Sequence, residues 1–230
     1  MESPLLLDRL AAHLRARRLD HPVRVGIDGP CGVGKSTLAR ALVAELVARG
    51  HPAVYLDSDG FHNVREVRYR QGRDSARGYY EDGYDFAALA ERVLVPLGPM
   101  GPSHSGPRPR RYPTKIHDLA SDAVVDDAVA VAPEDAIIVV DATFLQRGSL
   151  RDLWDEVIYL DAPRDICLER GIARDAEALG GPEAARAAYE HRYLAAWDIY
   201  VEEESPRDRA SIVLAYDDPA HPRVIRGLAS

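Results

Sequence analysis

The sequence has few cysteines, no long apolar run and no excess of positive charge. Its two cysteines, Cys31 and Cys167, are too few for a disulfide framework, which fits a reducing cytoplasmic location. No run of about 18 apolar residues occurs, so we expect no membrane span. A formal net charge of -8 disfavours broad binding to nucleic acid or to an anionic membrane. A local basic patch is still compatible with this net charge.

Several recognisable motifs are missing as well. The sequence contains no G-x-S-x-G, no C-x-x-C and, after the third expected strand, no guanine-reading N-K-x-D. The last absence counts against a GTPase switch, which would need guanine specificity. The remaining expectation is a protein that acts on small molecules, without nucleic-acid or membrane partners.

Chain length and apolar periodicity indicate one α/β domain. With 230 residues, 46% hydrophobic and 29% charged, the chain suits a single domain, residues 1–230, with a full core. Unbroken apolar strands alternate with helical stretches, which predicts a parallel sheet with helices on both faces. We expect five strands, at 23–28, 53–57, 137–141, 157–161 and 211–214. Helices are expected within 1–20, after Lys35, and at 86–97, 164–179 and 182–200.

A phosphate-loop pattern lies between the first expected strand and the helix that follows it. Residues 25–38, VGIDGPCGVGKSTL, contain G-x-x-x-x-G-K-[ST] in the strand–loop–helix context that the pattern requires. We expect the loop amides to bind nucleotide phosphates, Lys35 to reach the β- and γ-phosphates, and Ser36 to ligate Mg²⁺. A glycine-rich turn that binds nothing is the plain alternative. The predicted nucleotide-binding residues are Gly29, Cys31, Gly32, Val33, Gly34, Lys35, Ser36 and Thr37.

Acidic residues follow two strands at the edge where a γ-phosphate would point. Asp59 comes just after the second strand, in YLDSDGFHN, and is predicted to accept the proton of an attacking hydroxyl or to bind the metal. Asp57 is a lesser candidate, and both carboxylates could instead satisfy a turn. Asp141 ends the third strand, IIVVD, in a Walker-B-like place, and is predicted to help hold Mg²⁺. Strands often end in Asp without such a role.

Arginines in residues 164–193 are predicted to form a lid over a transferring phosphoryl group. Arg170 and Arg174 are four residues apart, so they share one helix face and are the main candidates. A solvated helix face is the alternative for each arginine, including Arg164, Arg186 and Arg192.

Two irregular segments, 60–84 and 98–118, are predicted to line an acceptor pocket, because ligands of open α/β sheets bind beyond the carboxyl ends of the strands. The first segment mixes arginines with tyrosines: Arg65, Arg68, Arg70, Arg73, Arg77, Tyr69, Tyr79 and Tyr80. His62 and His117 are candidate substrate contacts, although a lone histidine is more often a packed or surface residue. Cys31 lies at a helix N-terminus, where its thiol could be acidified, and a redox role is a remote alternative.

The motifs GIDGPCGVGKSTLA, LDSDGFHN, YDFAAL, VVDATFL, LRDLWDEVIYLD and ERGIARD carry a resemblance to a known family. In order and spacing they resemble uridine kinase-like proteins of the phosphoribulokinase/uridine kinase group of P-loop kinases, over residues 22–215. The resemblance implies a P-loop fold with a five-stranded parallel sheet and a helical lid, and transfer of the ATP γ-phosphate to a hydroxyl. It also implies that Asp59 is the catalytic base, that Asp141 replaces the usual Glu, and that Arg170 and Arg174 are lid arginines.

The resemblance defines the acceptor less closely. A nucleoside such as uridine or cytidine is expected, since Tyr112 and His117 resemble a pyrimidine-contacting Tyr-x4-His pair. Where nucleoside kinases hold the ribose with a carboxylate, this sequence has Tyr79, with Asp82 nearby, and GGPEAARAAYEHRY replaces the usual R-G-R run of the lid. A sugar, pantothenate or a nucleoside monophosphate is an alternative acceptor, and a non-catalytic ATP-binding regulator an alternative role. Related kinases are often oligomers, so self-association stays open.

Overall fold

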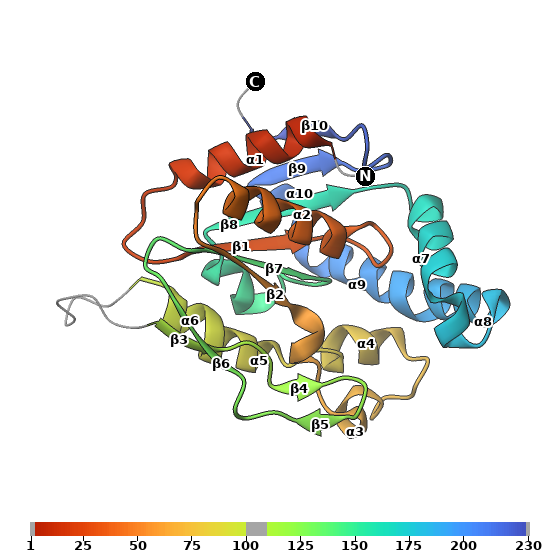
Figure 1. Cartoon of the computed structure of the whole chain (residues 1–230). Helices are drawn as coiled ribbons and strands as arrows, with labels where there is room; N and C mark the ends of the chain where they lie inside the picture. Colours follow the sequence, from red (N-terminus) through yellow and green to blue (C-terminus); the bar gives the residue numbers. More distant parts are fainter. Residues whose placement is uncertain (1–2, 100–109, 229–230) are drawn as a thin grey trace.

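The central sheet brings together strands from widely separated parts of the chain. In the computed structural model, which describes residues 3–99 and 110–228, the strand order is β10-β9-β8-β1-β7-β2 (Figure 1). The strands from β9 to β2 run parallel, which confirms the predicted α/β fold. Their bounds are β1 (Val23–Asp28), β2 (Ala53–Asp57), β7 (Ile137–Ala142), β8 (Glu156–Asp161) and β9 (Ile212–Ala215).

The sheet also has an antiparallel edge strand, β10 (Arg223–Arg226), which the sequence did not predict. It pairs with β9, and only Val224 among its residues is even partly buried. A short, mostly exposed strand lacks the unbroken apolar run by which buried strands are recognised. The predicted five-stranded parallel core is therefore present, with one strand added at its margin.

Alternating side chains of β7 feed two separate apolar layers, as a strand buried on both faces requires. Ile137 and Val139 face a layer formed with α1 (Pro4–Ala16) and α2 (Lys35–Ala48). Ile138 and Val140 face the other layer, which includes aromatic side chains of α4 (Ala76–Asp82) and α9 (Leu194–Glu204). Figure 1 shows these helix pairs on opposite sides of the sheet.

The remaining helices lie around this sandwich. In Figure 1, α7 and α8 stand beyond the carboxyl ends of the strands. Their bounds and those of the shorter helices are α3 (Arg65–Arg68), α5 (Phe86–Leu89), α6 (Val95–Leu97), α7 (Arg164–Leu179), α8 (Pro182–Ala188) and α10 (Pro206–Arg209). Single turns of π-helix, Ala90–Leu94 and Tyr189–Tyr193, connect α5 to α6 and α8 to α9. Among the described residues, no helix is both long enough and apolar enough to cross a bilayer.

Two small antiparallel ladders follow α6. Strand β3 (Arg110–Pro113) pairs with β6 (Val129–Ala132), and β4 (His117–Asp118) pairs with β5 (Ala123–Val124). The predicted irregular segment 98–118 thus contains paired strands from Arg110 onward, while its residues 100–109 lie outside the described part of the chain. The β4–β5 ladder contacts the turn Ser58–Phe61, so it stands near the end of β2.

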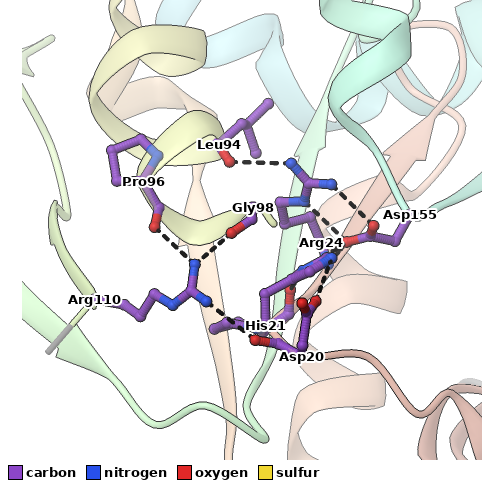
Figure 2. Close-up of polar contacts among 9 residues, drawn as sticks. Asp20, His21, Arg24, Leu94, Pro96, Gly98, Arg110 and Asp155 are labelled. Atoms are coloured by element: carbon purple, nitrogen blue, oxygen red, sulfur yellow. Dashed lines mark hydrogen bonds and ion pairs between the residues drawn. The ribbon is translucent and has the colours of Figure 1, made fainter. Parts of the chain in front are cut away.

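Arg24 fixes the amino-terminal end of β1 to its neighbours (Figure 2). Its Nε and Nη2 atoms each donate to the Asp155 carboxylate at 2.9 Å, and Nη1 donates to the Leu94 carbonyl oxygen at 3.1 Å. All three guanidinium nitrogens therefore have acceptors, and both side chains of this ion pair are nearly buried, with exposures of 6% and 11%. The contacts join the sheet to the end of the Ala90–Leu94 turn.

Arg110 performs a similar task beside it (Figure 2). Its Nη1 atom donates to the carbonyl oxygens of Pro96 and Gly98, and Nη2 donates to the Asp20 carbonyl oxygen at 3.1 Å. The Pro96 and Gly98 carbonyls lie at the end of α6, where acceptors lack partners within the helix, and the Asp20 carbonyl lies in the loop after α1. One guanidinium thus joins these two segments. We call Asp20, His21, Arg24, Arg110 and Asp155 the Arg24–Arg110 cluster.

Candidate active site

The phosphate loop joins the end of β1 to the start of α2. Gly32 and Gly34 have φ values of 84° and 113°, and a Cβ atom on Gly32 would lie 2.2 Å from the Cys167 carbonyl oxygen. Both positions therefore need glycine. No side chain caps the first turn of α2, so its amides point out of the helix without a side-chain acceptor. Such uncapped amides, with the helix dipole, bind phosphate well.

Lys35 reaches back over this loop. Its Nζ atom donates to the carbonyl oxygens of Gly29 and Pro30, at 2.8 and 2.9 Å, and to Thr143 Oγ1 at 3.3 Å. These acceptors are neutral, and no carboxylate among the described residues forms an ion pair with the ammonium. A phosphate oxygen would give Lys35 a charged acceptor, which forms the stronger hydrogen bond.

Ser36 and Asp141 meet at the carboxyl end of the sheet. Ser36 Oγ donates to Asp141 Oδ2 at 2.7 Å, and the Tyr55 hydroxyl donates to Asp141 Oδ1 at 2.6 Å. Burial, followed by the nearby Asp141 charge, raises the pKa of Tyr55, so its phenol stays a donor. Hydroxyl and carboxylate oxygens are suitable ligands for Mg²⁺. Among the described residues, no three His, Cys, Asp or Glu side chains converge to hold an ion.

Asp57 and Asp59 have different environments. Asp57 Oδ1 accepts the Asp59 backbone N–H at 3.1 Å, and its Oδ2 pairs with Arg40 at 3.2 Å, so this carboxylate does satisfy a turn. No hydrogen bond from a described residue reaches the Asp59 carboxylate, which has His62 Nδ1 at 3.8 Å and is 64% exposed. Desolvation within the cavity, followed by the charges of Asp57 and Asp141, raises the pKa of Asp59. Asp59 is thus the carboxylate of this turn that is open to a ligand.

A cavity of about 600 Å³ opens beyond the carboxyl ends of β1, β2 and β7. This volume is typical of a small-molecule site. Most of the predicted site residues line it: Cys31, Gly32, Lys35, Ser36, Thr37, Asp59, His62, Tyr79, Asp141 and Arg174.

A second hollow of about 270 Å³ lies beside the phosphate loop. Its lining includes the predicted residues Val33 and Gly34, together with Arg170 and Pro219. Gly32, Thr37 and Arg174 line both spaces, so the two meet at the loop. Gly29 lines neither, and contributes its carbonyl oxygen to Lys35.

The two candidate lid arginines of α7 differ in their contacts. Arg174 pairs with Asp175 at 2.7 Å and reaches the Tyr189 hydroxyl at 3.1 Å, on the wall of the larger cavity. Arg170 donates to the carbonyl oxygens of Tyr216 and Asp217, at 3.1 and 2.6 Å, and so ties α7 to the segment after β9. Both therefore lie beside the loop, with Arg174 alone of the two on the larger cavity.

His62 and Tyr79 form part of the cavity wall beside Asp59. His62 Nδ1 lies 3.3 Å from the Asp59 carbonyl oxygen, and its ring lies 4.2 Å from the Tyr84 ring. Burial lowers the pKa of His62 to about 4, so the imidazole is neutral at neutral pH. The Tyr79 hydroxyl lies 3.6 Å from Cys31 Sγ, which is a free, partly buried thiol.

Three predicted acceptor contacts do not line the cavity. Tyr112 is buried on β3, with 2% exposure. His117 Nε2 lies 3.0 Å from the carboxylate of Asp122, which was not predicted and which also accepts the Arg65 N–H at 2.8 Å. Asp82 is held by Arg70 and, at 2.7 Å, by Gln71. Tyr112, His117 and Asp82 are thus held by contacts within the protein.

The cavity is also lined by Arg68, Tyr69, Arg192 and Tyr193. The first two belong to the predicted arginine–tyrosine segment, whose Arg65, Arg70, Arg73, Arg77 and Tyr80 are absent from the lining. Arg192 was one of several lid candidates, and Tyr193 was not predicted. Arg192 and Tyr193 are adjacent in the HRY stretch, as Arg68 and Tyr69 are in segment 60–84. This repeated arginine–tyrosine neighbourhood is the sequence signal that could have identified Arg192 and Tyr193.

Asp28 is a buried carboxylate that the sequence reasoning missed. It ends β1 and accepts hydrogen bonds from the Tyr200 hydroxyl (2.6 Å), Gln146 Nε2 (3.1 Å) and the Gly29 N–H (2.9 Å). Burial raises its pKa, while these hydrogen bonds act against that rise. Asp28 therefore fixes the end of β1, where the phosphate loop begins. Its place immediately before the glycine pattern was the available signal.

The arrangement of loop, lysine, serine and strand-end carboxylates agrees with comparisons to known proteins. A profile described as the Phosphoribulokinase / Uridine kinase family matches residues 24–204. The chain belongs to this family. As a phosphoribulokinase/uridine kinase family member, it is an ATP-dependent small-molecule kinase, a phosphotransferase with an alcohol acceptor.

Individual relatives in the family have names that specify different acceptors. Uridine kinase from Latilactobacillus sakei subsp. sakei is 28% identical over 159 residues, which is 69% of either chain. Pantothenate kinase from Leifsonia xyli subsp. xyli is 33% identical over 207 residues, which cover 84% of this chain and 58% of that one. The structure of a possible uridine kinase from Bacillus stearothermophilus matches with a TM-score of 0.67 at 24% identity, covering 90% of this chain and 96% of that one. This structural likeness shows the fold alone.

Proposed function

We propose that the protein transfers the γ-phosphate of ATP to a hydroxyl group of a small molecule, with Asp59 as the base. The observation that carries this proposal is the Asp59 carboxylate, which no described residue holds by a hydrogen bond and which opens into the same cavity as Lys35 and Ser36. Asp57, by contrast, is held by the Asp59 backbone N–H and by Arg40.

The nucleotide-binding part of the proposal rests on the loop and its surroundings. The uncapped amides of α2 and the Lys35 ammonium suit the phosphates, and the smaller hollow beside Arg170 suits the rest of the nucleotide. Ser36 and Asp141 would hold Mg²⁺, because they present hydroxyl and carboxylate oxygens 2.7 Å apart. When bound, this ion would neutralise charge on the phosphate oxygens.

The proton transfer follows from the position of Asp59. As the acceptor oxygen forms its bond to the γ-phosphorus, the bond from that phosphorus to the β-bridging oxygen breaks and ADP leaves. The hydroxyl proton passes to Asp59, whose raised pKa makes it a better base than an ordinary aspartate. Arg174 lies on the cavity wall, where its guanidinium could move from Asp175 to the transferring phosphoryl group.

The acceptor has several candidates. A nucleoside such as uridine or cytidine is supported by the relatives that carry the name uridine kinase, and by the tyrosines of the cavity, on which a base could stack. Pantothenate is supported by the relatives named pantothenate kinase. Asp82, Tyr112 and His117 add no support for a nucleoside, since other contacts hold them outside the cavity lining.

One assay tests the proposed function. The protein is incubated with MgATP and a panel of nucleosides, nucleotides, sugars and pantothenate, and the products are analysed by mass spectrometry. We expect ADP together with a new phosphoester of at least one acceptor. If ATP binds but no panel member gains a phosphoryl group, a non-catalytic ATP-binding regulator becomes the better description.

A further inference from the structure

Arg192 lies in a box of aromatic rings in the cavity wall. Its guanidinium carbon is 5.0 Å from the centre of the Tyr69 ring, 5.1 Å from that of Tyr79 and 5.5 Å from that of Tyr193. Rings at these distances attract a cation and shield it from water. Within residues 3–99 and 110–228, no hydrogen bond or ion pair reaches this guanidinium, and its Nε atom is buried without a partner.

Arg68 lies against the same Tyr69 ring, at 5.5 Å, and adds to the positive charge beside it. Its Nη2 atom pairs with Asp122 at 3.0 Å, while its Nε atom is buried without a hydrogen-bond partner. Arg68 is therefore partly neutralised. Arg192 is the residue of the two that lacks a counter-ion in the described chain.

Several other side chains of the cavity lining are uncharged at neutral pH. The lining contains Tyr84 and Leu119, and His62 is neutral at neutral pH. Of the cavity's carboxylates, Asp175 pairs with Arg174, Asp141 binds Ser36 and Tyr55, and Asp57 binds its turn and Arg40. Asp59, the proposed base, is left open. Among the described residues, none of these four carboxylates forms an ion pair with Arg192.

We propose that the acceptor carries an anionic group, a carboxylate or a phosphate, besides the hydroxyl that is phosphorylated, and that Arg192 binds this group. The inference rests on the proposed function and narrows its acceptor. A guanidinium fixed between rings presents its donors in a planar fork that matches the oxygen atoms of either anion. A neutral acceptor that displaced water from this guanidinium would leave the cation without a partner, which is costly.

The position of Arg192 favours the acceptor over the phosphates of ATP. It contacts tyrosines of the irregular segment 60–84, and it does not line the smaller hollow beside the phosphate loop. Arg174 and Lys35 stand nearer the loop and supply the cations expected around the γ-phosphate. Arg192 is consequently a specificity-determining residue in this proposal.

The first experiment compares acceptors that differ in one charged group. The pairs are pantothenate with pantothenol, ribose 5-phosphate with ribose, and cytidine 5′-monophosphate with cytidine. We expect, in the pair that fits the pocket, a kcat/KM for the anionic member that is roughly 10²-fold the value for the neutral member, or higher. A carboxylate source and a phosphate source are distinguished by which pair shows the preference. Equal or greater kcat/KM for the neutral member of every pair would overturn the proposal.

The second experiment uses Arg192→Gln, with Arg73→Gln as the matched control. Arg73 also lies over the Tyr69 ring, at 5.4 Å, but it is exposed and does not line the cavity. We expect Arg192→Gln to raise KM for the anionic acceptor by roughly 10²-fold, with KM for ATP unchanged and with Arg192→Lys in between. Arg73→Gln should leave both constants near their original values.

Two other outcomes are informative. If Arg192→Gln lowers kcat alike for anionic and neutral acceptors, or raises KM for ATP, the residue serves the nucleotide and the proposal is wrong. If the original protein phosphorylates no acceptor at all, the proposed function fails instead, a result that the acceptor panel shows before any variant is made. An unchanged thermal transition in Arg192→Gln establishes that the variant is folded.

Discussion

Arg24 and Arg192 are the same residue type in two differently built regions. In the Arg24–Arg110 cluster, every guanidinium nitrogen of Arg24 has an acceptor within 3.1 Å, and the carboxylate of Asp155 is held in return (Figure 2). In the cavity, Arg192 is surrounded by rings and has no hydrogen-bond partner in the described chain. One arginine is satisfied by the fold, and the other is not.

This difference separates charges that serve the fold from charges that serve a ligand. Buried polar groups of folded proteins nearly always have partners, and an unpaired one is explained by a water, an ion or a ligand. The same contrast holds between the two carboxylates of the turn after β2, since Asp57 is held and Asp59 is open. Variants of each kind should therefore fail in different ways, in stability at the cluster and in turnover at the cavity.

The largest expected effect is on stability, from Arg24→Met. The substitution leaves the Asp155 carboxylate nearly buried without its ion-pair partner, so we expect a loss of about 3–5 kcal/mol in the free energy of unfolding. Chemical denaturation measures it. Arg186→Met, which removes an exposed pair with Glu190 at 3.4 Å, is the control and should change stability by less than about 1 kcal/mol. A stability loss from Arg24→Met no larger than that of the control would contradict the claim that the Arg24–Asp155 ion pair stabilises the fold.

Lys35→Ala should act on turnover. Without the ammonium, the transferring phosphoryl group loses a charged donor, so we expect kcat to fall by roughly 10²–10³-fold. Steady-state kinetics with MgATP measures the change. The chain's other lysine, Lys115, is 45% exposed beside Asp118, and Lys115→Ala should retain the original kcat. Full activity in Lys35→Ala would contradict the assignment of the phosphate loop.

His62 should make stability depend on pH. Its pKa is about 4 in the folded protein and 6.5 in an ordinary peptide, so between these values the unfolded chain binds a proton that the folded one does not. Stability is therefore complete above pH 6.5 and falls as the pH drops towards 4, by at most roughly 3 kcal/mol. Denaturation curves at several pH values measure this slope. His62→Gln should flatten it, and an equal slope in that variant would contradict the assignment.

The smallest expected effect is a shift in a pH profile. The charge of Asp57 is one cause of the raised pKa of Asp59, after desolvation. Asp57→Asn removes that charge and keeps an oxygen that can accept the Asp59 N–H. Because the base must be deprotonated, the acidic limb of kcat/KM should move to lower pH in this variant. A limb that stays in place or moves to higher pH would show that another group controls it.

The fold could be predicted from the sequence where the apolar pattern was unbroken. The strands at 137–141 and 157–161 have their side chains buried on both faces, and each lies in the sheet within one residue of its predicted bounds. The strand Arg223–Arg226 was missed, because its mostly exposed residues leave no apolar run. Apolar periodicity predicts which residues are buried, and few residues of this edge strand are buried.

The site could be predicted where one short motif fixes its own geometry. Lys35 and Ser36 lie on the cavity because the glycine turn and the helix after it dictate their positions. Tyr112 and His117 were assigned by their resemblance to a Tyr-x4-His pair, and such a motif does not say which way a strand turns its side chains. Both are buried outside the cavity lining. The box around Arg192 joins segments more than 100 residues apart, which no local pattern reveals.

Asp59→Asn tests the central claim most directly. The variant keeps the size of the side chain and removes its ability to take the hydroxyl proton. We expect calorimetry to show unchanged ATP binding, denaturation to show an unchanged free energy of unfolding, and the single-turnover rate with the identified acceptor to fall by roughly 10²–10⁴-fold. A rate within about threefold of the original would contradict the account, because the open carboxylate would then have no part in the reaction.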